Sequence, residues 1–291
     1  MNPSMISTLT AMNGLIKKLD VIANNMANAN TDGYKRKDVS FEDILTTRMR
    51  QPETFRQPGR MTPLGMVQGW GSRAGDVQID MGQGTFRSTG NQLDVAIEGD
   101  AFFEIGSEQT DNNGNRVLRA AWTRNGSFHL SMIPGDAGNS YLTTADGKLV
   151  IGKNNQPIVI PNQHRVIINP DGRITAVKEG DPLGQRVEVG QLKLVRVLRP
   201  QVLQEIGDHL FALPDNLRNV NGNDILQVID MAADPNQRPS IVIRQGFLED
   251  SNVDLTKEMT ELINVQRAFQ LNSRALQSGE MMMNLANNLR G

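Results

Sequence analysis

The feature that most restricts the fold of this chain is a regular spacing of apolar residues within its first 26 positions. The intervals alternate between four and three residues, which is a heptad pattern and places all members on one side of an α-helix. A stripe of this length can be buried only against another elongated element, so we expect the chain to begin with a helix that packs lengthwise on a partner. The stripe consists of Met5, Leu9, Met12, Ile16, Leu19, Ala23 and Met26.

Asparagines are concentrated near the end of this segment, at Asn24, Asn25, Asn28 and Asn30. Asparagine is a mediocre helix former because its amide competes for backbone hydrogen bonds. We therefore interpret the asparagine-bearing face as one that meets something outside the helix. The helical pattern ends near Gly33, where a glycine can adopt the left-handed conformation that stops a helix.

A second helical pattern occupies residues 254–288, and Asp254 can cap its first turn. At 1.5 Å per residue the two helices would span ~40 and ~50 Å. Two arrangements remain open: the helices pair with each other as a coiled-coil hairpin, or each packs separately on the middle of the chain. The heptad regularity favours the hairpin. The C-terminal stripe consists of Leu255, Met259, Leu262, Phe269, Leu276 and Met283.

Between the helices, the apolar residues alternate with a period of two, which is typical of short β-strands. Three dipeptides between these runs predict hairpin turns, at Asn125–Gly126, Asp146–Gly147 and Asp171–Gly172. The fold class is therefore α+β, with long N- and C-terminal helices around an all-β middle. We divide the chain into an N-terminal axial helix (1–35), an extended, proline- and glycine-rich arm (36–75), an all-β domain (76–249) and a C-terminal axial helix (250–291).

The composition argues against several functions. The formal net charge of −2 provides no basic field for nucleic acid, and the absence of cysteine excludes thiolate zinc sites and cysteine nucleophiles. The histidines, His129, His164 and His209, do not have metal-ligand spacing, and no nucleotide-binding or hydrolase motif occurs. Two carboxylates could still meet in three dimensions, but nothing favours catalysis. We expect no cofactor, no membrane-spanning segment and no cleavable signal peptide.

Four stretches resemble the bacterial flagellar rod and hook family. The segment LDVIANNMANANTDGYKR (19–36) is similar to that family's N-terminal signature, with Met26 in place of a leucine and Tyr34 in place of a phenylalanine. LDVAIEGDAFFEI (93–105) and WTRNGSFHL (122–130) resemble its internal motifs. QGFLEDSNVDLTKEMTELINVQRAFQLNS (245–273) resembles its C-terminal signature. The stretches occur in the family's order and extend over most of the chain.

The resemblance implies a structural, axial subunit of the flagellar basal body that polymerises into a helical tube around a channel and transmits torque. Its partners would be further copies of itself, other rod and hook proteins, and the flagellar type III export apparatus, and it would act outside the cytoplasm, in the periplasm or cell-wall zone. The positions that match the signatures are carried over as assembly contacts: Asn24, Asn25, Asn28, Asn30, Thr31, Gly33, Tyr34, Gly246, Glu249, Ser251, Asn252, Glu258, Met259, Gln266 and Arg267.

The position within the rod is less constrained. The stretch between residues 41 and 90 resembles distal rod proteins, which favours a distal position, whereas 180–197 looks equally like proximal rod proteins. A hook-type subunit and a secreted β-domain for binding or adhesion are the alternatives. Because isolated helices of this kind are marginal in water, residues 1 to about 35 and those beyond about 253 are expected to be disordered in the monomer and helical in the polymer.

Overall fold

The computed structural model describes residues 3–44, 46–49, 66–69, 71–110, 116–132, 138–178, 186–207, 209–214, 225–229 and 241–289. The chain divides into two compact units. We call them the terminal unit (Met1–Ala27, Lys37–Asp80 and Asp254–Gly291) and the central unit (Asn28–Arg36 and Met81–Val253). The fold is α+β, as predicted, with a helix towards each end and a β-rich middle.

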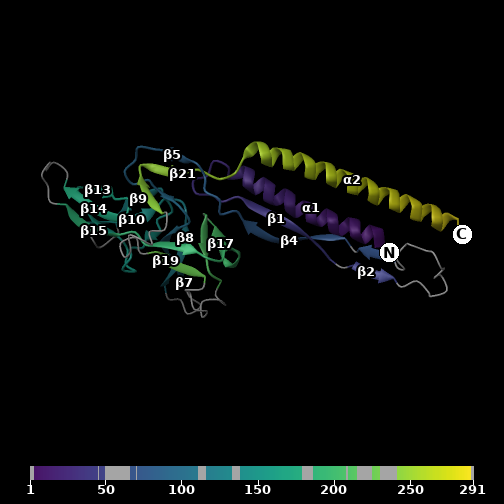
Figure 1. Ribbon diagram of the computed structural model, residues 1–291, viewed down its shortest axis with the longest axis horizontal. Helices are drawn as coiled ribbons and strands as arrows, with labels where there is room; N and C mark the ends of the chain where they lie inside the picture. The colour runs from purple at the N-terminus through teal and green to yellow at the C-terminus, as the bar shows by residue number, and fades with distance from the viewer. Residues whose placement is uncertain are drawn as a thin grey trace, which may run out of the picture. The chain divides into compact units, whose positions relative to one another are not determined.

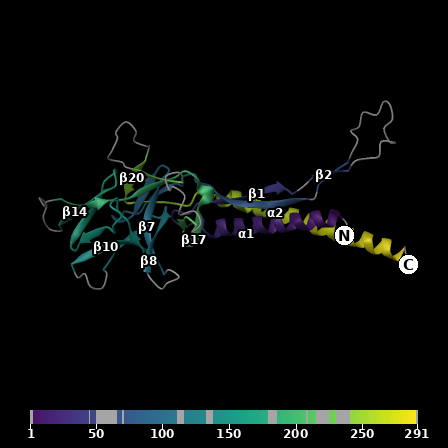
Figure 2. The same cartoon turned by 90° about the horizontal axis from the view of Figure 1, so that it is seen from below.

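The terminal unit contains the two helices, α1 (Pro3–Ala27) and α2 (Leu255–Asn288), which lie side by side and antiparallel (Figures 1 and 2). Asp254 caps α2 as predicted, because its side chain accepts hydrogen bonds from the backbone N–H groups of Thr256 and Lys257. Near the other end of α2, Gly279 lies against Met5. None of the helices in the described part of the chain is long and apolar enough to cross a membrane.

The described residues of the predicted arm form strands of the terminal unit. β1 (Lys37–Asp43) pairs antiparallel with β4 (Ser72–Ile79), and both strands pack against α1. β2 (Thr46–Met49) pairs antiparallel with β3 (Met66–Gly69). The rest of the proline- and glycine-rich stretch, residues 45, 50–65 and 70, lies outside the described residues. The helix α1 therefore has two neighbours in this unit, α2 and the β1–β4 ribbon.

The central unit is built of short strands. A ten-stranded sheet has the order β12-β10-β11-β7-β8-β18-β17, with β9 beside β10 and β16 joining β7 to β19. The strands of this sheet are β7 (Phe102–Thr110), β8 (Arg116–Thr123), β9 (Phe128–Ser131), β10 (Asn139–Thr144), β11 (Leu149–Val150), β12 (Val159–Pro161), β16 (Leu194–Val197), β17 (Gln204–Gly207), β18 (Leu210–Ala212) and β19 (Leu226–Ile229).

Smaller sheets complete the central unit. They comprise β13-β14-β15, β20-β6 and β21-β5. Their strands are β5 (Phe86–Ser88), β6 (Val95–Glu98), β13 (His164–Ile168), β14 (Arg173–Lys178), β15 (Val187–Gln191), β20 (Val242–Gln245) and β21 (Phe247–Glu249), and a 3-10 helix, η2, spans Pro200–Val202.

The apolar core of the central unit lies around β6, β7 and β9. Phe103 and Phe128 are fully buried there, with ring centroids 5.1 Å apart in an edge-to-face arrangement. Ile97, Ile105 and Leu142 are also fully buried in the same cluster. Aromatic pairs of this geometry stabilise a core beyond the area that they bury. The described strands therefore enclose a continuous apolar interior.

Two of the predicted hairpin turns are confirmed and the third is wrong. Asp146–Gly147 joins β10 to β11, and Asp171–Gly172 joins β13 to β14. Asn125–Gly126 does not close a hairpin, because β9 pairs with β10 whereas β8 pairs with β7 and β18. Gly126 serves close packing instead, since a Cβ atom there would lie 1.7 Å from the carbonyl oxygen of Val95.

Candidate assembly site

The N-terminal signature, residues 19–36, extends beyond the end of α1, so its Gly33 lies outside the helix. The helix ends at Ala27, and residues 28–33 form turns within the central unit, where the N–H of Thr31 donates to the carbonyl of Asn28. Gly33 has a φ of +72°, and its N–H donates to the carbonyl of Glu249 at 2.7 Å. A Cβ atom on Gly33 would lie 2.6 Å from the backbone nitrogen of Asn125. The glycine therefore allows close docking of the signature and is not the residue that stops α1.

A buried ion pair holds the segment that follows. Lys35 Nζ lies 2.6 Å from Glu249 Oε1, and each of the two side chains is 1% exposed. Lys35 Nζ also donates to the carbonyl of Gly82 at 2.8 Å, and the N–H of Gly84 donates to Glu249 Oε1 at 3.0 Å. Buried charges are tolerated only when they are paired and hydrogen-bonded, and both conditions are met here.

Arg124 adds a second cation to this carboxylate. Its Nη1 atom lies 3.3 Å from Glu249 Oε2, and the guanidinium also donates to the carbonyls of Ile97 and Gly99, at 3.2 and 2.7 Å. Burial lowers the pKa of Arg124 below its ordinary value, while the charge of Glu249 acts in the opposite direction. We call Lys35, Arg124 and Glu249 the signature cluster, because each belongs to a stretch that the sequence analysis singled out.

Polar contacts surround the signature cluster. Asn252 Oδ1 accepts from the N–H of Arg36 at 2.6 Å, and its Nδ2 donates to the carbonyl of Gly82 at 2.9 Å. Tyr34 is buried with its ring edge-on to His209 at 5.5 Å. The N-terminal and C-terminal signatures are thus joined to each other inside the central unit.

An exposed arginine bridges the same two signatures at the surface. Arg87 lies 2.6 Å from Asp32 and 2.9 Å from Asp250, and its side chain is 51% exposed. Hydrogen bonds to Asp250 and Asp32 raise the pKa of Arg87. Exposed pairs of this kind contribute little to stability because water and salt screen them.

The terminal unit has its own buried polar contact. Asn25 Nδ2 donates to the carbonyl of Lys37 at 2.8 Å and to Glu258 Oε2 at 3.3 Å, and Asn25 Oδ1 accepts from the N–H of Lys37 at 2.9 Å. Asn25 and Glu258 are 1% and 0% exposed. One amide therefore ties the end of α1 to the start of both β1 and α2.

The predicted stripe of α1 is only partly buried, since Met5, Met12, Leu19 and Met26 are half-buried. The other members are exposed, with Leu9 at 45%, Ile16 at 44% and Ala23 in the exposed class. A second buried and half-buried row, one residue earlier at the same heptad spacing, consists of Thr8, Ala11, Leu15, Lys18, Ile22 and Asn25. The two rows together give α1 a broad half-buried surface, because α1 packs against both α2 and the β1–β4 ribbon.

The helix α2 carries both buried and exposed apolar residues. Its buried and half-buried row, again at heptad spacing, consists of Glu258, Leu262, Val265, Phe269, Asn272, Leu276 and Gly279. Its exposed large apolar residues lie on several sides of the helix, and the predicted stripe members Leu255 and Met283 are exposed at the two ends of the buried row. The exposed set comprises Leu255, Met259, Ile263, Leu271, Met281, Met282, Met283, Leu285 and Leu289. The pairing of α2 with α1 therefore leaves many apolar side chains of α2 uncovered.

The fifteen residues predicted as assembly contacts fall into three groups of burial. Asn25, Gly33, Tyr34, Glu249 and Glu258 are buried. Asn28, Thr31, Gly246, Ser251 and Asn252 are half-buried. Asn24, Asn30, Met259, Gln266 and Arg267 are exposed. The buried group is bonded within the subunit, so the interpretation of the asparagine face as wholly outward-facing does not describe Asn25.

The sequence alone does not identify Lys35, Lys37 or Arg124 as site residues. Lys35 and Arg124 stand inside the quoted signature stretches, which is the signal that could have identified them. Nothing local marks either residue as buried, since a lysine or arginine in a turn-rich segment is usually exposed. Their burial becomes understandable only from their contacts with the Glu249 carboxylate in the folded protein.

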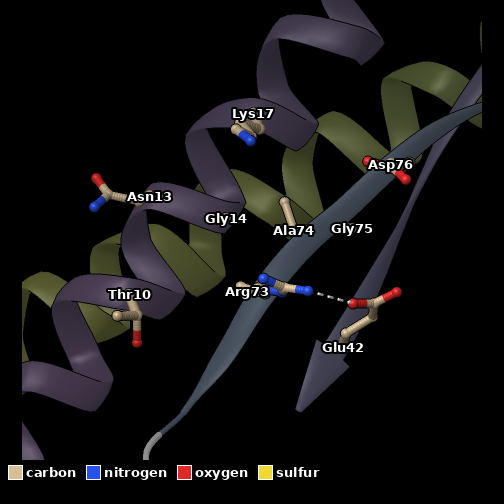
Figure 3. A pocket seen from close by; sticks show the side chains of 9 residues that line it. All are labelled: Thr10, Asn13, Gly14, Lys17, Glu42, Arg73, Ala74, Gly75 and Asp76. Atoms are coloured by element: carbon tan, nitrogen blue, oxygen red, sulfur yellow. Dashed lines mark hydrogen bonds and ion pairs between the residues drawn. The ribbon is translucent and has the colours of Figure 1, made fainter. Parts of the chain in front are cut away.

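A polar groove of about 510 Å³ lies between α1 and β4 in the terminal unit. Figure 3 shows Arg73 of β4 reaching toward Glu42 of β1, at 3.2 Å, with Asn13 and Lys17 on α1 along the other wall. No histidine lines the groove. Among the described residues, no group of three histidine, aspartate or glutamate side chains is placed to hold a metal ion.

Three protein-family models match successive parts of the chain. "Flagella basal body rod protein" matches residues 7–35, "Flagellar hook protein FlgE/F/G D1 domain" matches 96–176, and "Flagellar basal body rod FlgEFG protein C-terminal" matches 244–289. Each member of the signature cluster comes from a different one of these regions. The cluster is thus the place where the three matched parts meet.

Similarity to individual proteins extends over the full length. The chain is 31% identical to the flagellar hook-basal body complex protein FlhP of Bacillus subtilis (strain 168) over 294 residues, which cover 99% of each chain. The chain belongs to the flagellar basal-body rod and hook family. It is 32% identical to the flagellar basal-body rod protein FlgG of the same organism over 98% of each chain, and 32% identical to FlgG of Borreliella burgdorferi over 97% of each chain.

Membership in this family confirms the resemblance and determines the class of function. Flagellar rod and hook proteins are structural, so this protein is a structural subunit of the flagellar basal body. The candidate surfaces for assembly are the exposed apolar side chains of α2 and the exposed stripe residues of α1, and the candidate anchors are the signature cluster and the Asn25–Glu258 contact.

Proposed function

We propose that this rod-family subunit polymerises with copies of itself into a helical tube that encloses a channel and transmits torque. In this proposal α1 and α2 pair as a coiled coil in the inner layer of the tube. The observation that carries the proposal is the set of exposed apolar side chains on α2, which includes Met259, Ile263 and Leu271. Large exposed apolar surfaces mark interaction sites.

The exposed row of α1 supports the same conclusion. Leu9, Ile16 and Ala23 have the spacing of a helix stripe but are exposed in the single subunit. These three positions would then contact neighbouring subunits, while the other stripe members, Met5, Met12, Leu19 and Met26, are half-buried within the subunit. Of the predicted assembly contacts, the exposed members Asn24, Asn30, Met259, Gln266 and Arg267 are proposed to meet neighbours directly.

The remaining partners and the location follow from the family. We propose that the chain is exported by the flagellar type III apparatus, joins other rod and hook proteins, and functions in the periplasm or cell-wall zone. The four regions predicted from the sequence would act as two axial helices, an arm and an outer β-domain. We place the subunit in the distal rod, with the proximal rod as the second position, on the resemblance of residues 41–90.

A hook-type subunit is the second candidate function. It is favoured by the match of residues 96–176 to a hook protein domain and by the similarity to a protein named for the hook-basal body complex. The two candidates differ in the polymer, because a rod is straight whereas a hook is curved and flexible. They share the same helix surfaces, so the shape of the polymer must decide between them.

Electron microscopy of the purified chain after polymerisation tests the proposal. A straight tube is expected, and Ile16→Asn should abolish it while leaving the central unit folded. Lys17→Asn is the matched control, because the neighbouring position is also exposed but contributes no apolar surface. A curved filament would favour the hook-type subunit, and the absence of any polymer from the unaltered chain would contradict both candidates.

A further inference from the structure

The central unit is connected to the rest of the chain at four points, before Asn28, after Arg36, before Met81 and after Val253. Residues beside three of these points meet at the signature cluster. Lys35 stands beside the second point, Gly82 beside the third, and Glu249 and Asn252 precede the fourth. Segments that are distant in sequence are therefore gathered at one buried location.

Two acceptors, the Gly82 carbonyl and the Glu249 carboxylate, connect these segments through hydrogen bonds. The carbonyl of Gly82 accepts from Lys35 Nζ at 2.8 Å and from Asn252 Nδ2 at 2.9 Å. Glu249 Oε1 accepts from Lys35 Nζ at 2.6 Å and from the N–H of Gly84 at 3.0 Å. Removing the Lys35 ammonium would thus break its hydrogen bonds to both acceptors at once.

The segment 28–36 also makes backbone contacts with the C-terminal signature. The N–H of Gly33 donates to the carbonyl of Glu249, and the N–H of Arg36 donates to the side chain of Asn252. All of these partners belong to the central unit. These hydrogen bonds therefore require neither helix of the terminal unit nor a neighbouring subunit.

We propose that the signature cluster is a clamp that keeps residues 28–36 folded on the central unit in the free monomer. Ordered structure then begins at residue 28, whether or not α1 and α2 have formed. This differs from the expectation that disorder in the monomer extends to about residue 35.

Hydrogen exchange of the full-length monomer, read by mass spectrometry, tests the clamp. In the unaltered chain, peptides covering 28–36 should be protected like β7, while peptides from α1 exchange fast. Lys35→Met removes the ammonium but leaves Glu249 paired with Arg124, so the core keeps its ion pair. This change should lower protection of 28–36 by about 10- to 100-fold, because a buried hydrogen bond to a charged group is lost. Protection of β7 should not change.

Two further variants control for folding and for charge. Asn252→Ala removes only the amide cross-link and should give a smaller loss confined to the same peptides. Arg87→Gln removes the exposed bridge between the same two signatures and should have little effect. Fast exchange of 28–36 in the unaltered monomer would overturn the proposal, as would an equal loss of protection in 28–36 and β7 after Lys35→Met. The result does not depend on polymerisation, so it leaves the proposed rod function open.

Discussion

The terminal and central units differ in the size of their enclosed apolar core. In the central unit, Phe103 and Phe128 are fully buried in a large cluster, and the charges of Lys35 and Glu249 are buried as a pair. In the terminal unit, few apolar side chains are buried, an amide and a carboxylate lie at the buried contact between elements, and Ile263 is half exposed. Both units leave some apolar side chains exposed, but only the central unit has a large enclosed core.

The difference between the two units bears on both folding and assembly. Burying a leucine or isoleucine side chain stabilises a protein by roughly 1.5–3 kcal/mol, so covering an exposed one with a neighbour would add stabilisation of this order. The polar residues buried in the terminal unit orient its elements, since an amide or carboxylate accepts only partners of defined geometry. The buried polar contacts therefore orient the elements of the terminal unit, while its exposed apolar side chains remain available to a neighbour in the proposed polymer.

The largest expected effect comes from truncating the same side chain in each unit. Phe103→Ala should lower the free energy of unfolding of the central unit by about 3–5 kcal/mol, because it opens a cavity in a fully enclosed core. Phe41→Ala in β1 should cost about 1 kcal/mol or less, since Phe41 is 41% exposed. Calorimetry of the two variants checks the difference. Similar losses in both would show that the terminal unit has an enclosed core of its own.

The next effect distinguishes a buried asparagine from its exposed neighbour. Asn25→Asp places a carboxylate beside Glu258 and removes the donor to the Lys37 carbonyl, at a cost of about 2–4 kcal/mol to the terminal unit. Asn24→Asp makes the same charge change at an exposed position and should cost about 0.5 kcal/mol or less. Sedimentation and far-ultraviolet circular dichroism of the assembled protein should show lost helix and polymer only for Asn25→Asp. Equal behaviour would contradict the anchoring role of Asn25.

The smallest effect on the monomer should accompany a large effect on assembly. Ile263→Ala removes an exposed side chain of α2, so the unfolding free energy of the monomer should change by less than about 0.5 kcal/mol. If a neighbour covers this face, the critical concentration for polymerisation should rise about 10- to 100-fold. Lys257→Ala, at an exposed position that contributes no apolar side chain, is the control. An unchanged critical concentration would show that this part of α2 stays exposed in the polymer.

The sequence by itself determined the element types and their periods. The heptad spacing predicted both helices, and Asp146–Gly147 and Asp171–Gly172 predicted hairpins that the structure contains. These features are local, because backbone geometry sets the period of a helix or strand and the residues of a tight turn. The signature stretches also identified the family, and therefore the structural role, without any coordinates.

Only the tertiary structure decided which face of each element is buried and which charges are paired. The buried side chains Ile22 and Asn25 of α1 lie outside the predicted apolar stripe, because the β1–β4 ribbon adds a second neighbour that the stripe does not encode. Asn125–Gly126 has the composition of a hairpin turn but serves close packing against Val95. Lys35 and Glu249 are 214 residues apart in sequence, and a lysine becomes a buried clamp residue only when folding brings its carboxylate within hydrogen-bonding distance. The sequence sets the period of a helix or strand, whereas the elements that pack around it determine which of its side chains are buried.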